Sequence, residues 1–197
     1  KYSGGMVTNY LQGVCMWHIM HRLKWSHNVT EGKALLRGAV TLAPMSSKHK
    51  PYEPYTVDIL SLMCNNLNLV DPADAAVFTC LTTNFWCTAR IGKFTIPRLD
   101  TFDPFLHIKP SNVTHEKDCQ GVMVTIFHLP KTKYALLGED ISWAQQNGPL
   151  DPQVALQNHF NVNNPPMDGH LFAYKHKGCY HPLTKLKFTT SLPSAAK

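Results

Sequence analysis

One arginine lies at the end of a strongly apolar segment, where an ordinary role in the core is hard to assign to it. Residues 85–94 read Phe-Trp-Cys-Thr-Ala-Arg-Ile-Gly-Lys-Phe, so Arg90 directly follows the apolar stretch and precedes Gly92. A guanidinium held at a helix end can grip a phosphate with two parallel hydrogen bonds. Arg90 can equally form a structural salt bridge, and this segment alone leaves both interpretations open.

Two lysines lie in a segment that has the pattern of a β-hairpin. Residues 121–128 alternate with Val122, Val124 and Ile126 on one face, which predicts a strand, and residues 134–137 are its predicted partner. Lys131 and Lys133 fall between the two strands, where an ammonium group can reach a phosphate as a charge or as a proton donor. The alternative is that both lysines only keep the hairpin soluble.

Other residues that carry chemistry form weaker patterns. His18 and His21 can share a helix face near Cys15, but no carboxylate lies close in sequence to complete a metal site. The sequence contains no P-loop, dinucleotide-binding, serine-hydrolase or zinc-protease motif. We therefore expect no bound metal and no cofactor.

Positive charge is concentrated at the start of the chain. The 197 residues carry a net charge of +6, and residues 1–51 account for all of it, with seven basic residues against Glu31 alone. This distribution favours a polyanion as partner, although a merely soluble basic surface is the alternative. If the partner is DNA, the expected contacts come from Arg22, Lys24, Lys33, Arg37, Lys48, Lys50 and the hairpin residue Lys131.

The elements that must position these residues are predicted to be mainly helical, with a small antiparallel sheet. Residues 5–22 and the segment capped by Thr30 have helical periodicity, and a polar, proline-rich stretch at residues 44–54 follows them. We therefore expect a helical module over residues 1–50 and an α+β module over residues 51–197.

Within the second module, three residues that can cap helices mark the expected helix starts. These residues are Thr56, Asp71 and Asp151, and each Asp is followed by proline. The helix that begins after Asp71 should extend to about Trp86. Residues 171–174 are predicted to form a short strand.

Location follows from the cysteines and from the absence of long apolar runs. The six cysteines form no CxxC pair, which is typical of free thiols in a reducing compartment. The sequence contains no run of about 18 apolar residues, so no membrane span is predicted. No signal-peptide pattern follows Lys1. We expect no membrane partner and an intracellular, nuclear location.

The order of the motifs resembles the tyrosine recombinase and integrase superfamily, especially the group found in fungal mobile elements. The stretches that carry this resemblance are Thr8-Asn9-Tyr10-Leu11-Gln12-Gly13, Trp17-His18, Leu36-Arg37-Gly38-Ala39, Asp71-Pro72-Ala73-Asp74-Ala75-Ala76, residues 86–94, Phe102-Asp103-Pro104, residues 129–133 and Asp151-Pro152. The resemblance implies a core-binding module followed by a catalytic module, double-stranded DNA as partner, and possible homo-oligomers on DNA. Recombination or integration of DNA is the implied process.

The resemblance also implies roles for single residues. The family cuts DNA with a tyrosine nucleophile, two arginines, a histidine-type residue and a hairpin lysine. By position, Arg90 is similar to the first arginine and Lys133 to the hairpin lysine, with Lys131 as second choice. The family has an acidic residue where this chain has Lys93, and a lysine there would repel Arg90.

The resemblance is incomplete in its later motifs. No arginine follows Arg98, no HxxR motif occurs, and Tyr174 and Tyr180 lie too early to be the nucleophile. We therefore expect a C-terminally truncated pseudoenzyme that binds DNA and does not cut it alone. The alternative is a repurposed protein that binds a carbohydrate or protein ligand through exposed aromatic residues such as Trp25, Tyr52, Tyr55 and Trp143.

Overall fold

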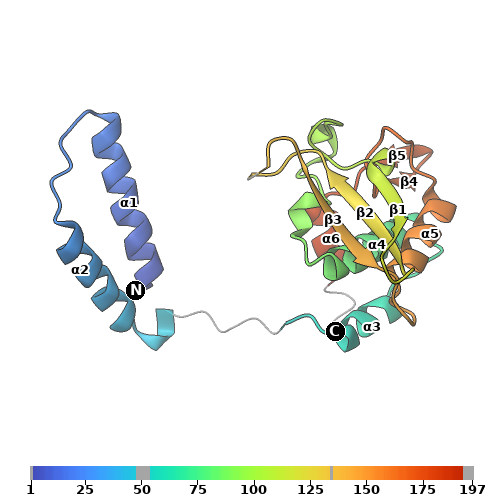
Figure 1. The fold of residues 1–197 in the computed structure, drawn as a ribbon, viewed down its shortest axis with the longest axis horizontal. Coiled ribbons are helices and arrows are strands. Elements are labelled where there is room, and N and C mark those ends of the chain that lie inside the picture. Colours follow the sequence, from blue (N-terminus) through green and yellow to red (C-terminus); the bar gives the residue numbers. More distant parts are fainter. Residues whose placement is uncertain (1, 48–53, 134, 193–197) are drawn as a thin grey trace. The chain divides into compact units, whose positions relative to one another are not determined.

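The computed structural model describes residues 2–47, 54–133 and 135–192 (Figure 1). The chain forms two compact units, Lys1–Pro54 and Tyr55–Lys197. The predicted class is confirmed, because the described residues form six α-helices and small antiparallel sheets. Each unit is described by itself below.

Unit 1 is a pair of helices, as predicted. Helix α1 spans Gly4–Met20, α2 spans Val29–Thr41, and a short 3-10 helix follows at Met45–Ser47. The cap of α2 is Asn28 and not Thr30, because the Asn28 side chain accepts the amide hydrogens of Thr30 and Glu31 at 3.0 and 3.3 Å. Asparagine is among the strongest capping residues, and it precedes the helix by one residue.

Unit 2 contains the remaining elements. In chain order they are α3 (Val57–Asn65), α4 (Pro72–Trp86), β1 (Val113–Lys117), β2 (Met123–Leu129), β3 (Glu139–Ala144), α5 (Pro152–Asn163), β4 (Tyr174–His176), β5 (Cys179–His181) and α6 (Lys185–Ser191). The predicted helix starts are confirmed, since Thr56, Asp71 and Asp151 each accept backbone amide hydrogens of the following turn. Strands β1, β2 and β3 form one antiparallel sheet, and β4 and β5 form another.

The predicted partner strand at residues 134–137 is wrong. The partner of β2 is β3, which begins at Glu139, and residues 135–137 lie in the loop between the two strands. Leu136 and Leu137 are 73% and 95% exposed, so their apolar character does not reflect a sheet face. Residue 134 lies outside the described residues. The strand predicted at residues 171–174 is also misplaced, because β4 begins only at Tyr174.

Helix α4 is the centre of the unit 2 core. Nine consecutive residues of this helix, numbers 75–83, are buried. Helices α5 and α6 and strands β3 and β4 all contact α4 (Figure 1). The buried hydroxyl of Thr79 donates to the carbonyl oxygens of Ala75 and Ala155, both at 2.8 Å. Polar side chains inside the core therefore bind backbone groups and help join α4 to α5.

Candidate nucleic-acid interface

The turn after α4 determines where Arg90 lies. The amide of Thr88 donates to the carbonyl of Phe85 at 3.1 Å, and that of Ala89 donates to Asn84 at 3.0 Å. This is a Schellman motif, in which glycine usually occupies the left-handed position. Here Thr88 occupies it, with φ of 50°, and a β-branched residue in this conformation costs about 1–2 kcal/mol.

Arg90 directly follows this turn and is exposed. It precedes a 3-10 helix at Ile91–Lys93 and makes no side-chain capping bond. In the described part of the chain it forms no ion pair, so it is not buried against a carboxylate. Phe94 anchors the segment, because its ring is fully buried against Phe127 and Phe172. A flexible charged side chain thus extends from a firmly anchored loop.

Lys93 has a carboxylate partner of its own. Its ammonium nitrogen lies 3.6 Å from Glu139 Oε1, and both side chains are partly exposed. Glu139 pairs with Leu129 across β2 and β3, at the end of the hairpin next to its loop. The contact therefore joins the Arg90 loop to the hairpin that carries Lys131 and Lys133, and it offsets the positive charge that we expected to repel Arg90.

The hairpin presents its two lysines on either side of a buried threonine. Lys131 and Lys133 are exposed, whereas Thr132 is 5% exposed. The Thr132 hydroxyl oxygen accepts the amide hydrogen of Ala135 at 3.0 Å, and the Thr132 amide donates to the Ala135 carbonyl at 2.9 Å. This turn holds the segment in place while the lysines face away from the core.

Gly138 closes the hairpin. Its φ is +90°, and a Cβ atom there would lie 2.5 Å from the Leu129 carbonyl oxygen and 2.7 Å from His128 Nε2. On the outer face of the sheet, His128 Nδ1 contacts Asp140 Oδ1 at 2.7 Å. The sequence predicts the hairpin, but neither this cross-strand pair nor its position could be read without the register of β3.

The basic residues predicted in unit 1 are exposed where the structure describes them. Arg22, Lys24, Lys33 and Arg37 are all exposed, and none takes part in an ion pair among the described residues. Arg22 follows the end of α1 with a left-handed φ of 55°. Lys48 and Lys50 lie outside the described residues.

The aromatic surface of the alternative hypothesis is only partly present. Trp143 is 3% exposed and packs against Phe127 with ring centroids 5.7 Å apart, so the expectation of an exposed Trp143 is wrong. Its alternation with polar neighbours on β3 places it on the inner face of the sheet. Tyr55 is 58% exposed, Trp25 is half-buried, and Tyr52 lies outside the described residues.

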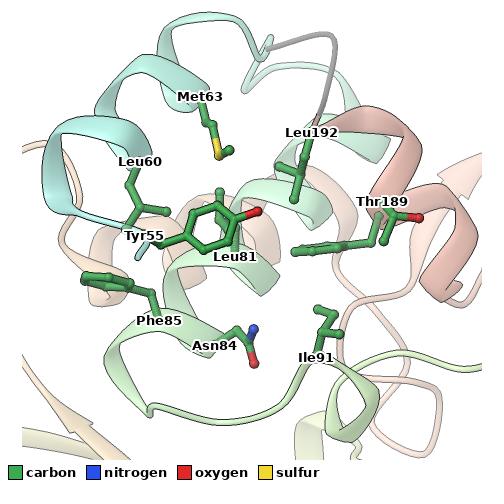
Figure 2. A pocket seen from close by; sticks show the side chains of 10 residues that line it. Tyr55, Leu60, Met63, Leu81, Asn84, Phe85, Ile91, Thr189 and Leu192 are labelled. Atoms are coloured by element: carbon green, nitrogen blue, oxygen red, sulfur yellow. The ribbon is translucent and has the colours of Figure 1, made fainter. Parts of the chain in front are cut away.

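An apolar pocket of about 540 Å³ lies beside the Arg90 turn (Figure 2). Its lining comes from α3, α4, α6 and the segments next to them: Tyr55, Leu60, Met63, Leu81, Asn84, Phe85, Ile91, Phe188, Thr189 and Leu192. Asn84 Oδ1 is buried without a hydrogen-bond partner. Sequence analysis missed this pocket because its walls are distant in the chain and meet only in the folded unit.

Two features of the described residues concern metal binding and membrane spanning. No group of three or more His, Cys, Asp or Glu side chains could hold a metal ion there. None of the helices there has the length and apolar character needed to cross a membrane.

The comparisons with known proteins concern the fold. No protein-family model and no curated protein sequence matches the chain. A solved Flpe–Holliday junction complex is similar, with a TM-score of 0.50 and 13% identity over 88% of this chain and 43% of that one. A mutant Flpe–DNA Holliday junction complex is similar with a TM-score of 0.50 and 14% identity, over 88% of this chain and 44% of that one.

A Flp recombinase–Holliday junction complex is also found, with a TM-score of 0.45 and 13% identity over 96% of this chain and 41% of that one. The chain thus spans less than half the length of these structures. Its arrangement of helices and small antiparallel sheets is similar to part of the fold of Flpe, a tyrosine recombinase.

Proposed function

We propose that the chain is a double-stranded DNA-binding protein of the tyrosine recombinase type, linked to DNA recombination or integration. The observation that carries this proposal is a set of exposed cations on unit 1 that form no ion pair with any described residue: Arg22, Lys24, Lys33 and Arg37. Acidic residues there would oppose a polyanion, and Glu31 is the only one in residues 1–51. Assembly of several copies on DNA, a nuclear location and an origin in a fungal mobile element belong to the same proposal.

In unit 2 we assign Arg90 and Lys133 to a DNA phosphate, with Lys131 beside them. The assignment is supported by the exposure of all three side chains and by the Lys93–Glu139 contact between the two segments that carry them. Guanidinium and ammonium groups suit this role because their hydrogen bonds to an anion are charge-assisted. The family pattern gives Lys133 preference over Lys131.

Binding without cutting is the outcome that we propose for this chain alone. The sequence has no HxxR motif and no candidate nucleophile in the place that the family pattern requires. Loss of one phosphate-stabilising donor typically slows such a step by about 10²- to 10³-fold. Loss of the nucleophile removes the covalent step altogether. What remains is a partial phosphate site of two cations.

Fluorescence anisotropy of a labelled duplex at about 50 and about 200 mM salt tests the proposal. Each phosphate that a cation neutralises releases counterions, so the four contacts of unit 1 alone should weaken binding at least about 10²-fold between these conditions. No binding at the lower salt, or an affinity that does not fall as salt rises, would show that the surface is merely basic.

A further inference from the structure

One face of α1 carries exposed aromatic rings that the fold of unit 1 does not use. Tyr10, Trp17 and His21 lie on the same side of the helix by their spacing. Tyr10 and Trp17 are 59% and 52% exposed. They border a hollow of about 620 Å³, where a Cβ atom on Gly13 would meet no atom within 4 Å. The hollow is therefore unobstructed at Gly13, between Tyr10 and Trp17.

The rings continue past the end of α1 as a connected series. Ring centroids are 4.5 Å apart for Trp17 and His21, 5.2 Å for Trp17 and His18, and 5.0 Å for His18 and Trp25. Trp25 then stacks on His27 at 5.7 Å with an interplanar angle of 27°. These mutual contacts hold the series in a defined arrangement.

The end of this series is fixed to α2. A Cβ atom on Gly32 would lie 1.8 Å from His27 Nε2, so the imidazole ring can lie against the helix only because residue 32 is glycine. On the other side of unit 1, Gly4 allows α1 to approach α2, since a Cβ there would lie 2.5 Å from Val40 Cα. The rings thus belong to a pair of helices in which α1 approaches α2 closely at Gly4 and His27 lies closely against α2 at Gly32.

Cations lie within the ring series, and the one acidic residue near it is Glu31, which lies beside His27 at the α2 end. Residues 1–30 contain no Asp or Glu, while Arg22 and Lys24 lie between His21 and Trp25. Arg22 occupies a left-handed position where glycine would be free of strain. Exposed rings alone would suit a protein or a lipid surface, and cations alone would suit any polyanion.

The two features together suit a nucleic acid strand with accessible bases. Aromatic side chains stack on bases, and basic side chains track the backbone, in proteins that bind single strands. Paired bases inside a duplex cannot stack on these rings. From Tyr10 to His21 the helix rises about 16 Å, which matches about five bases at about 3.4 Å each.

We propose that this surface, formed by α1 and the segment to His27, binds an unpaired DNA strand. Trp17 and His21 stack on bases, and Arg22 and Lys24 contact phosphates. Trp25 packs against His18, which in turn contacts Trp17. The ligand being DNA rests on the proposed function. The preference for an unpaired strand is the additional claim.

The test compares the affinities of the full chain for two labelled DNAs. One is a blunt duplex, and the other is the same duplex with an unpaired tail of about five nucleotides. The tail should tighten binding about tenfold, as expected for one or two stacked bases. Trp17→Ala should remove the gain from the tail and leave affinity for the blunt duplex unchanged. Trp17→Phe should keep most of the gain, because phenylalanine still stacks.

Arg22→Gly provides a variant whose loss of binding cannot be assigned to misfolding. It removes the charge and relieves the left-handed conformation, so thermal unfolding should be unchanged or shifted upward while binding to tailed DNA weakens. The inference of unpaired-strand binding would be overturned if wild-type protein bound both DNAs with equal affinity, or if Trp17→Ala weakened binding to both DNAs equally. Neither result would contradict the proposed binding of duplex DNA. Failure to bind either DNA at low salt would overturn the proposed function as well.

Discussion

Arg90 owes its exposure to the residues on either side of it. Thr88 directs the chain out of α4 in a left-handed conformation, and Phe94 returns it to the core. We expect Arg90→Ala to weaken duplex binding about tenfold through loss of charge-assisted hydrogen bonds to phosphate. Anisotropy measures the loss. Arg98→Ala is the matched control, since Arg98 is exposed but paired with Asp100 at 3.1 Å; equal effects of the two substitutions would contradict the assignment of Arg90.

Thr88 itself provides a second prediction at the residue scale. Glycine at the left-handed position of a Schellman motif avoids the clash of Cβ with the backbone. Thr88→Gly should therefore raise the free energy of unfolding by about 1 kcal/mol and leave DNA affinity unchanged. Urea denaturation measures the first effect. A fall in the free energy of unfolding would mean that contacts of the Thr88 side chain stabilise the fold by more than the backbone strain at this position costs.

At the scale of elements, the β2–β3 hairpin depends on the glycine at position 138. Gly138→Ala would bring a Cβ atom into contact with the Leu129 carbonyl oxygen, so we expect a loss of about 1–3 kcal/mol of stability. Amide hydrogen exchange in β2 and β3 should become faster, and DNA binding through Lys131 and Lys133 should weaken. Gly148→Ala is the control, because its φ is also positive, at +99°, but nothing lies near its Cβ position. If both variants lose the same stability, the loss comes from backbone strain and not from the contact of the added Cβ with the Leu129 carbonyl oxygen.

Elements with local signals were predictable, and those that depend on pairing were not. The helices after Asp71 and Asp151 follow from an aspartate cap and a proline in the first turn. The position of β3 follows from the turn at Gly138, which residues 134–137 do not reveal. Helix α6 was missed because it is short and only Phe188 on it is buried. The cations that we propose to contact phosphate were identified from residue types alone. The Lys93–Glu139 contact and the apolar pocket could be identified only from the fold.

Unit 2 as a whole should lose stability in mild acid because it buries neutral histidines. His159 Nε2 donates to the Leu171 carbonyl and its Nδ1 accepts from Asn163, both at 3.0 Å. Burial lowers the pKa of His159 to about 4, and burial with the nearby His107 and His159 lowers that of His170 to about 3. In the unfolded chain both titrate near about 6.5.

The sign of the pH effect follows from these pKa values. Above pH about 6.5 neither state binds the extra protons, so stability is complete. As pH falls toward the folded values, only the unfolded chain takes up protons, and each histidine lowers the free energy of unfolding by up to about 1.4 kcal/mol per pH unit. Urea unfolding followed by tryptophan fluorescence at about pH 7.5 and about pH 5 measures this. His159→Gln should reduce the dependence of stability on pH, and equal stability of the wild-type protein at both pH values would contradict this prediction.

For the whole molecule, the central claim is that the exposed cations of unit 1 bind DNA phosphates. The direct measurement is the slope of the logarithm of duplex affinity against the logarithm of salt concentration. Wild-type protein is compared with a variant that combines Arg22→Gln, Lys24→Gln, Lys33→Gln and Arg37→Gln. The slope should become less steep by about 0.9 for each lost phosphate contact, or about 3.6 in total. An unchanged slope would show that these residues do not contact DNA and would contradict the account.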